Sequence, residues 1–278
     1  MQGSGFDPRA FWSDLVSGSG GLENVGHPRL GVYNAWAYRF RLAALKKVLV
    51  PGTLAGARVF EAAFGEGFYL KHWRRAGVSR VDGMDISPRA MASATSAFPE
   101  FGLRCGDLAD DASFQGLARY DVVTAIDVLY HIPDATAWTR AVGNLLDLVD
   151  EDGVFITTDK FPASGSYQKY PHVKRRSLAM WRDELGAKGF KIHRILPVFL
   201  LMDDPITFGE HPGLGRLAAF QWKVLTEPIK ALKGVPRLQS LLASAVAAAQ
   251  YLPERVALSL LRRTPNLELL VCTREGGG

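Results

Sequence analysis

Four acidic side chains follow short apolar runs of the sequence, each at the point where a predicted strand ends. They are Glu61, Asp85, Asp107 and Asp127. A carboxylate after the second strand can accept hydrogen bonds from both hydroxyls of a ribose, and one after the third can accept from an exocyclic amino group. Each residue alone could equally be a helix cap or a turn residue. Ligands bind outside the carboxyl ends of the strands in an open parallel sheet, so four such residues favour a ligand site at this edge.

The turn after the first predicted strand would let the backbone approach such a ligand. Residues 59–68 indicate a strand ending in Glu61 and a turn that contains Gly65 and Gly67, and a helix follows that ends before Gly77. Neither turn glycine has a Cβ to block a ligand, and a helix start offers unpaired N–H donors. Many α/β proteins turn in this way, so the turn alone is a weak indication.

Strand and helix patterns alternate from residue 59 onwards, which predicts a parallel sheet with helices on both faces. The fourth strand, Tyr120–Ile126, is apolar through its middle, as a strand covered on both sides should be. The other predicted strands lie at 59–61, 81–86, 103–105, 153–158, 190–201 and 266–273. The predicted helices between them lie at 69–76, 87–97, 135–149 and 177–188.

Residues 1–57 precede this core and contain aromatic, helical patterns. A short amphipathic helix around Trp12 is followed by a glycine-rich break at 17–21 and by a longer helix that ends at Pro51-Gly52. The aromatic side chains could pack on the main domain or close over a small ligand as a lid. Those assigned to the ligand side are Tyr33, Trp36 and Tyr38.

Residues 210–263 form an apolar and basic segment before the last strand. Helices are predicted at 214–225, 238–251 and 253–262. Over residues 212–263 we count eight basic and two acidic side chains, a net charge of +6. Such an insertion could form a homodimer face, cover a substrate or make a peripheral contact with a membrane surface, or it could be a solvated basic face over a packed stripe.

The overall composition excludes several classes of protein. The net charge of +5 is mild and dispersed, which argues against a nucleic-acid partner. Cys105 and Cys272 are far apart and have no metal-ligand spacing, so we expect no metal site and a reducing, cytoplasmic setting. The first residues lack the pattern of a secretory signal, and no apolar run reaches the ~18 residues of a spanning helix. We therefore expect a soluble protein without an integral membrane segment.

The chain resembles the class I S-adenosylmethionine-dependent methyltransferases. The resemblance rests on five segments in order, at 59–68, 83–88, 105–108, 120–132 and 152–158. It implies an α/β, Rossmann-like, seven-stranded and mostly parallel sheet. The implied division is an N-terminal helical lid at 1–57, a cofactor domain at 58–209 and 264–275, and a helical insertion at 210–263. The chain departs from the family at Ala63, where glycine is usual and where alanine fits if its φ angle is negative.

The resemblance also implies S-adenosylmethionine as the cofactor and a role for each matching residue. Glu61 would orient the turn and hold the methionine ammonium through water, Asp85 would accept from the ribose hydroxyls, and Asp107 would accept from the adenine amino group. The implied cofactor-binding residues are Glu61, Ala63, Phe64, Gly65, Gly67, Asp85, Ile86, Asp107, Leu108, Asp127 and Val128.

The implied reaction is an in-line displacement at the sulfonium methyl, for which the protein aligns an acceptor atom and excludes water. An alcohol or phenol acceptor also loses a proton, and His131 and His172 are the candidate bases. His131 could instead be a structural residue at a helix start. His172 lies in what we predict to be a loop that closes over the pocket, and it is the histidine favoured for direct contact with the acceptor. Further acceptor-side candidates are Tyr130, Tyr167 and Tyr170.

The leading interpretation is therefore an O-methyltransferase of a small molecule, such as a sugar, a lipid-linked compound or a secondary metabolite. There are three alternatives: a small-molecule methyltransferase that acts on nitrogen or carbon, a catalytically silent scaffold subunit, and a nicotinamide-dependent oxidoreductase. The absent third glycine of a dinucleotide fingerprint counts against the oxidoreductase. A nucleic-acid methyltransferase is disfavoured because Ile126-Asp-Val-Leu contains no Pro-Pro-aromatic element, and the chain contains no Pro-Cys nucleophile.

Overall fold

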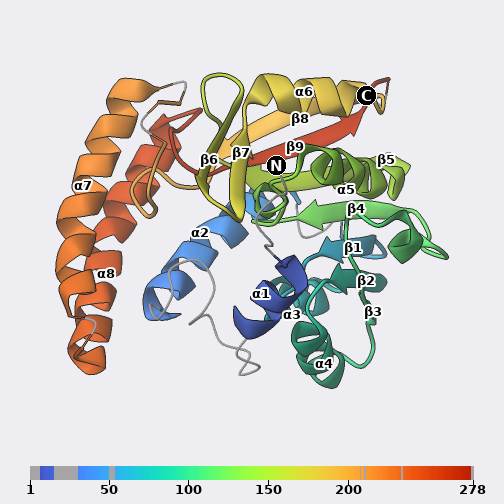
Figure 1. Ribbon diagram of the computed structural model, residues 1–278, viewed down its shortest axis with the longest axis horizontal. Helices are drawn as coiled ribbons and strands as arrows, with labels where there is room; N and C mark the ends of the chain where they lie inside the picture. The colour runs from blue at the N-terminus through green and yellow to red at the C-terminus, as the bar shows by residue number, and fades with distance from the viewer. Residues whose placement is uncertain are drawn as a thin grey trace.

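A seven-stranded sheet forms the centre of the computed structural model, which describes residues 7–15, 31–49, 54–206, 208–209, 211–232 and 234–276 (Figure 1). The strands lie in the order β3-β2-β1-β4-β5-β9-β8. Neighbours from β3 to β5 pair in parallel, whereas β9 runs antiparallel to both β5 and β8. The predicted α/β, mostly parallel sheet of seven strands is confirmed.

The strand bounds follow the apolar runs of the sequence. The strands of the sheet are β1 Arg58–Ala62, β2 Arg80–Asp85, β3 Gly102–Cys105, β4 Tyr120–Ala125, β5 Val149–Asp159, β8 Phe190–Pro197 and β9 Glu268–Arg274. Alternate residues face opposite sides of a strand, and both sides of β1 are covered because Val59 and Phe60 are each fully buried in different hydrophobic clusters. β5 begins four residues earlier than predicted (149 against 153), and its pairing with β4 is irregular between Val149 and Val154.

Helices cover both faces of the sheet. Those within residues 58–209 are α3 Phe68–Ala76, α4 Pro88–Ala97, α5 Ala135–Asp147 and α6 Leu178–Gly186, with short 3-10 turns η1 Asp111–Phe114 and η2 Leu129–His131. Ser87, Asp134 and Ser177 cap α4, α5 and α6, since each side chain accepts a backbone N–H three residues later. Buried residues of α3 and α4 share one cluster with Val59, whereas those of α5 and α6 share the other with Phe60.

Two N-terminal helices precede the sheet, α1 Pro8–Leu15 and α2 Gly31–Val48. The residues of α2 are buried in the same cluster as β1, so α2 is an integral part of the core. Residues 8, 11 and 12 of α1 line a cavity described below, which is the position that the predicted lid requires. The predicted glycine-rich break at 17–21 and the helix end at Pro51-Gly52 lie outside the described residues.

The insertion contains two long helices, α7 Pro212–Ala231 and α8 Pro236–Leu260, which pack side by side at one edge of the molecule (Figure 1). The predicted boundary before Pro253 is wrong, because Pro253 lies inside α8. A proline removes one helical hydrogen bond, and Pro253 and Ala249 are both exposed, so the carbonyl that loses its donor can face water. Among the described residues, no helix has the length and apolar character needed to cross a bilayer.

A two-stranded hairpin lies outside the main sheet. Its strands are β6 Ser166–Tyr170 and β7 Val173–Arg176, which pair antiparallel. Residues 167–172 were predicted to be a loop, which is wrong for residues 167–170 because they belong to β6. Pro171 and His172 form the turn between the two strands. Both strands are short, β6 is mostly exposed and polar, and β7 is mostly lysine and arginine, so they lack the alternating apolar pattern that identifies a strand in a sequence.

Candidate active site

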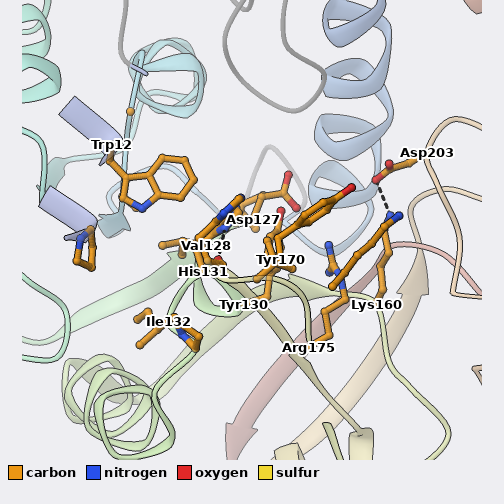
Figure 2. Close-up of a pocket in the computed structure, with 18 of the residues that line it drawn as sticks. Trp12, Asp127, Val128, Tyr130, His131, Ile132, Lys160, Tyr170, Arg175 and Asp203 are labelled. Atoms are coloured by element: carbon orange, nitrogen blue, oxygen red, sulfur yellow. Dashed lines mark hydrogen bonds and ion pairs between the residues drawn. The ribbon is translucent and has the colours of Figure 1, made fainter. Parts of the chain in front are cut away.

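The C-terminal ends of β1 to β4 open into one cavity with a volume of about 1370 Å³. Its other walls come from α1, α2, the β6–β7 hairpin, α7 and residues 199–206. Figure 2 shows some of the side chains that line it. Small-molecule sites usually measure about 300–1,000 Å³, so this cavity has room for a cofactor-sized ligand and a second molecule. The strand-end carboxylates Asp85, Asp107 and Asp127 all lie in its wall.

The glycine turn after β1 adopts left-handed backbone angles at three positions. The φ angles are 54° at Ala63, 50° at Gly65 and 76° at Gly67. The condition under which alanine was said to fit, a negative φ angle, is not met at Ala63. The Ala63 N–H donates to the carbonyl of Met84 over 2.7 Å, which ties the turn to the end of β2 and holds the alanine in this conformation. A Cβ in the left-handed region costs energy that glycine avoids.

Replacing Ala63 by glycine should therefore stabilise the protein. We expect Ala63→Gly to raise the free energy of unfolding by about 0.5–1 kcal/mol, measured by chemical denaturation. Ala62→Gly is the matched control, because Ala62 is fully buried in β1 and should lose stability on the same change. A loss of stability in Ala63→Gly as large as in the control would contradict a strained turn.

Asp85 joins the end of β2 to this turn. One carboxylate oxygen accepts the Gly65 N–H over 2.8 Å, and the other accepts the Ser87 N–H over 2.8 Å. Burial raises the pKa of Asp85, and the two N–H donors oppose that rise. A Cβ at Gly65 would meet no atom within 4 Å, so the backbone there is open to the cavity. A buried carboxylate and an accessible stretch of backbone thus lie next to each other.

Asp107 lies one strand further along the same edge. Its carboxylate accepts the Ala109 N–H over 2.9 Å, and its own N–H lies 3.3 Å from the hydroxyl of Ser113. Ile86, Asp107 and Leu108 line the cavity in front of β2 and β3. This part of the wall combines apolar side chains with a carboxylate, which suits a flat ring that carries an amino group.

Two of the predicted cofactor residues do not line the cavity. Glu61 lies beneath the turn, where its Oε2 accepts from Trp73 Nε1 over 2.7 Å and from Thr124 Oγ1 over 2.6 Å. Burial raises the pKa of Glu61 to about 7. Gly67 begins α3, and a Cβ there would lie 2.8 Å from the ring of Phe98. Both residues support the turn on the side away from the cavity. Three other predicted cofactor-binding residues of the turn, Ala63, Phe64 and Gly65, line the cavity.

Asp127 follows β4 and is held from two sides. Its backbone, with a φ of 58°, donates to Thr158 Oγ1 over 2.8 Å, and that hydroxyl donates back to the carboxylate over 2.8 Å. The second carboxylate oxygen accepts from Nε of Arg41 in α2, and the two side chains are only 15 % and 8 % exposed. The Arg41 guanidinium also lies over the ring of Phe199, 4.7 Å from its centre.

Sequence reasoning missed Arg41. The signal was an arginine within the apolar face of a helix, four residues after Ala37 and four before Leu45, both of which are buried. A charge on such a face needs a partner of opposite sign. The predicted neighbour of Asp127, Val128, also lines the cavity.

The two predicted histidines, His131 and His172, meet in the wall of the cavity. Nδ1 of His131 lies 3.1 Å from the carbonyl oxygen of His172, so Nδ1 donates and Nε2 keeps its lone pair (Figure 2). The His131 ring packs edge-on against Trp12 of α1, with 4.6 Å between the ring centres. Burial lowers the pKa of His131 to about 3 and also lowers the pKa of His172.

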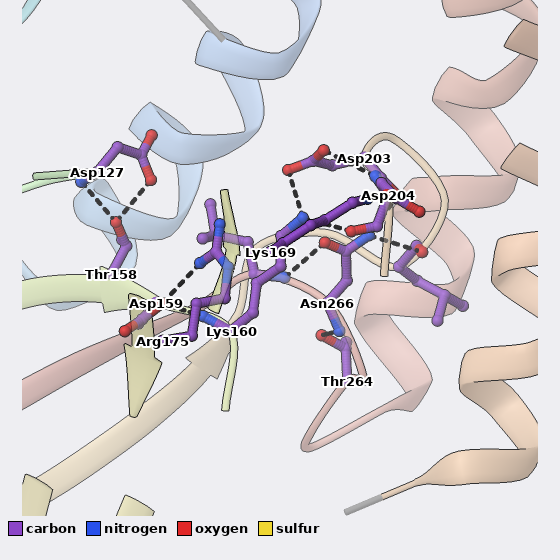
Figure 3. A network of polar contacts seen from close by, with 12 residues as sticks. Asp127, Thr158, Asp159, Lys160, Lys169, Arg175, Asp203, Asp204, Thr264 and Asn266 are labelled. Atoms are coloured by element: carbon purple, nitrogen blue, oxygen red, sulfur yellow. Dashed lines mark hydrogen bonds and ion pairs between the residues drawn. The ribbon is translucent and has the colours of Figure 1, made fainter. Parts of the chain in front are cut away.

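A group of ion pairs closes the far end of the cavity (Figure 3). Arg175 of β7 pairs with Asp159 over 2.6 Å, and its guanidinium lies 4.1 Å from the centre of the Tyr130 ring. Lys160 pairs with Asp203 over 2.8 Å, although the lysine side chain is only 6 % exposed. Tyr130 was predicted, but the charged residues were missed, because they come from the end of β5, the hairpin and residues 198–206, which share no local motif.

The predicted aromatic side chains divide into two groups. Tyr33 and Trp36 do not line the cavity, which corrects their assignment to a ligand. The Tyr33 hydroxyl donates to Gln250 over 2.9 Å and its side chain is 1 % exposed, while the Trp36 ring packs on Tyr251. Both lie on the side of α2 that faces α8. The aromatic residues that do line the cavity are Tyr38, Tyr130, Tyr167 and Tyr170.

Residues 60–155 match the profile of a family described as "Methyltransferase domain". This stretch is a class I, Rossmann-like methyltransferase domain. It contains the glycine turn and the carboxylates at the ends of β2, β3 and β4, whereas the hairpin, α7 and α8 lie outside it.

Curated proteins are similar to part of the chain. A ubiquinone biosynthesis O-methyltransferase of Xanthomonas euvesicatoria pv. vesicatoria is 31% identical over 96 residues, which cover 34% of this chain and 40% of that protein. A second, from Neisseria meningitidis serogroup C, is 30% identical over 118 residues, covering 40% of this chain and 48% of that protein. The chain thus spans less than half of the length of these curated relatives.

Two solved structures extend the likeness in fold. Magnesium protoporphyrin IX methyltransferase from Synechocystis with bound SAM aligns with a TM-score of 0.51 at 23% identity, covering 70% of this chain and 91% of that one. An O-methyltransferase from a trans-AT PKS multienzyme of Brevibacillus brevis, in complex with S-adenosyl-L-homocysteine, aligns with a TM-score of 0.54 at 15% identity, covering 97% and 80%. At these identities the likeness shows the fold alone.

Proposed function

We propose that this protein is an S-adenosylmethionine-dependent methyltransferase that acts on oxygen of a small molecule. The observation that carries the proposal is the pairing of the Asp85 carboxylate with the Gly65 N–H at the mouth of the cavity. Each Asp85 oxygen accepts one N–H in the structure, and a carboxylate has about four lone-pair positions, so acceptor capacity is left for two ribose hydroxyls. The class I methyltransferase domain around it supports the same cofactor.

The chemistry of the wall also fits the two ends of this cofactor. Asp107 would accept from the adenine amino group, with Ile86 and Leu108 against the ring. The methionine end carries an ammonium and a carboxylate, and Asp127 and Arg41 offer the matching charges at one place. When bound, S-adenosylmethionine would supply a methyl group on a sulfonium. The sulfur is a good leaving group in an in-line displacement at that methyl carbon.

The protein's own part in the reaction is alignment, exclusion of water and proton transfer. Trp12 of α1, which belongs to the predicted lid at 1–57, and the tyrosines of the hairpin line the cavity and would cover a bound acceptor. Neutral His131 would accept the hydroxyl proton at Nε2, because the His172 carbonyl keeps the other ring nitrogen protonated. Transfer to oxygen is further supported by the similarity to ubiquinone biosynthesis O-methyltransferases.

Calorimetric titration tests the cofactor assignment, and transfer of a labelled methyl group to hydroxyl-bearing small molecules tests the activity. We expect binding of S-adenosylmethionine and S-adenosylhomocysteine, and no binding of nicotinamide dinucleotides. Binding of dinucleotides alone would replace the proposal by an oxidoreductase. Binding of S-adenosylmethionine without transfer to any hydroxyl, amine or carbon acceptor would favour the silent scaffold subunit.

The histidines should affect turnover and leave cofactor binding intact. We expect His131→Ala to lower the turnover number by at least about tenfold, since a positioned base contributes about 10²–10⁴-fold. His172→Ala should have a smaller effect, because its backbone carbonyl and not its ring holds His131. His193→Ala is the matched control, since His193 is exposed on β8 and should turn over at the wild-type rate.

The pH profile follows from the direction of the His131 shift. A pKa of about 3 in the folded state leaves the imidazole neutral, and able to accept a proton, at every pH above about 4. The turnover number of the wild type should therefore show no step between pH 5 and 8, where an ordinary histidine titrates. A double histidine variant that is fully active would contradict this role, and a wild-type rate that rises through pH 6–7 would contradict the lowered pKa of His131.

A further inference from the structure

We propose that the outer face of α7 and α8 docks the protein on a membrane surface that contains anionic lipids. This inference is independent of the proposed methyl transfer. It concerns an apolar stripe on the solvent side of the two helices, called here the outer stripe. The outer stripe consists of Leu217, Phe220 and Val224 of α7 and Leu238, Leu241, Leu252, Val256 and Leu260 of α8.

The α7 part of the outer stripe faces away from the core. Leu217, Phe220 and Val224 are 65%, 70% and 53% exposed, and their spacing of three and four residues places them on one helix face. Trp222, which is buried, stands two residues from both Phe220 and Val224 and so roughly 200° around the helix. α7 is therefore apolar on its core side and on its solvent side.

The α8 part has the same arrangement over a longer distance. Leu252 and Val256 are 68% and 51% exposed, while Glu254 between them is fully buried on the opposite side. Leu241 and Leu260 are 67% and 77% exposed and extend the face towards both ends of the helix. A soluble surface helix is normally polar on its outer face, so two adjacent helices with exposed leucines mark an interaction surface.

The charges beside the outer stripe indicate what covers it. Over the described residues of α7 and α8 the exposed charged side chains are five bases and one acid, namely Arg216, Lys223, Lys230, Arg237, Arg255 and Glu227. Glu227 pairs with Lys230 over 2.9 Å. Exposed apolar residues flanked by lysine and arginine are typical of helices that lie in the headgroup region of a membrane. In a two-fold dimer through this face, each copy would place its basic residues against the same basic surface.

The docking face is also connected to the cavity. Trp222 and Lys230 of α7 line the cavity, and α8 fixes one of its walls through Glu254, whose two carboxylate oxygens accept the N–H groups of Leu200 and Leu201 over 2.5 and 2.7 Å. A docked molecule would therefore hold its cavity within one helix diameter of the lipid headgroups, about 10–12 Å.

Sedimentation of the full chain with lipid vesicles tests the proposal. Vesicles of phosphatidylcholine with phosphatidylglycerol should bind the protein, and pure phosphatidylcholine vesicles should bind it much more weakly. The variant Leu241→Glu/Leu252→Glu/Leu260→Glu should lose at least about tenfold in vesicle affinity through lost apolar contact. A second variant, Lys223→Gln/Arg237→Gln/Arg255→Gln, should lose roughly a hundredfold, because each base near an anionic surface contributes about fivefold.

A matched control removes the same charge elsewhere. Arg119→Gln/Arg182→Gln/Lys191→Gln changes three exposed bases that lie before β4, on α6 and on β8, and should bind anionic vesicles as the wild type does. Circular dichroism shows whether each variant is folded. Equal losses in the control and in the α7–α8 charge variant would overturn a specific docking face. The proposal would also be overturned if the protein does not bind vesicles but forms a dimer, and if the variant Leu241→Glu/Leu252→Glu/Leu260→Glu is monomeric. That result would show that a second copy covers the outer stripe.

Discussion

Asp85→Ala should weaken S-adenosylmethionine binding tenfold to a hundredfold. The carboxylate at the end of β2 would accept charge-assisted hydrogen bonds from the ribose hydroxyls, and such bonds contribute about 1.5–3 kcal/mol. The substitution also frees the Gly65 N–H, which the carboxylate accepts over 2.8 Å, so the glycine turn would hold its shape less well. Titration calorimetry of the folded variant measures the effect directly.

Two further variants separate ribose binding from general damage. Asp121→Ala removes a partly exposed aspartate that pairs with Arg58 at the opposite end of β4, and its cofactor affinity should equal that of the wild type. Asp85→Asn keeps one acceptor oxygen and should fall between the wild type and Asp85→Ala. The ribose assignment is wrong if folded Asp85→Ala binds the cofactor with unchanged affinity.

The sheet could be predicted because its strands are covered on both sides. Strands such as β1 and β4 are mainly apolar at their centres. The residues at the helix termini each have one physical function. Ser87 and Ser177 provide oxygen acceptors for free N–H groups, and Gly77 takes a left-handed φ of 70°. Such features depend on residues close together in the chain, so they can be predicted from the sequence.

Features that depend on distant partners could not be predicted. The left-handed Ala63 exists because its N–H reaches the carbonyl of Met84 on another strand. Pro253 lies inside α8 because neighbouring helices hold that helix in place, in spite of the missing donor. The β6–β7 hairpin has no alternating apolar pattern, since it lies against the cavity and not in the sheet.

The candidate site divides in the same way. The carboxylates at the strand ends could be predicted because a parallel sheet brings its carboxyl ends to one edge. Their cationic partners could not, since Arg41 lies 86 residues from Asp127 in the chain and Arg175 lies 16 residues from Asp159. The position of each depends on how a helix or hairpin packs against that edge.

Arg41→Ala should lower the free energy of unfolding by about 3–5 kcal/mol. The substitution leaves the Asp127 carboxylate, only 15 % exposed, without its cation, and an uncompensated buried charge has a cost of this size. Because the pair would also bind the methionine end, cofactor affinity should fall as well. Chemical denaturation gives the stability, and titration of the folded fraction gives the affinity.

A matched control and a double variant decide whether the ion pair is the cause. Arg39→Ala changes an exposed arginine of the same helix, whose guanidinium lies only over Trp36, and should alter stability by less than about 0.5 kcal/mol. Adding Asp127→Asn to Arg41→Ala removes the unpaired charge and should restore part of the lost stability, because the two sites are in direct contact and their effects are not additive. The cofactor affinity should stay low in the double variant, since both charges for the methionine end are then gone. If the two substitutions were simply additive in stability, the buried contact between Arg41 and Asp127 would contribute nothing to the fold, and the position of Asp127 would depend on Thr158 alone.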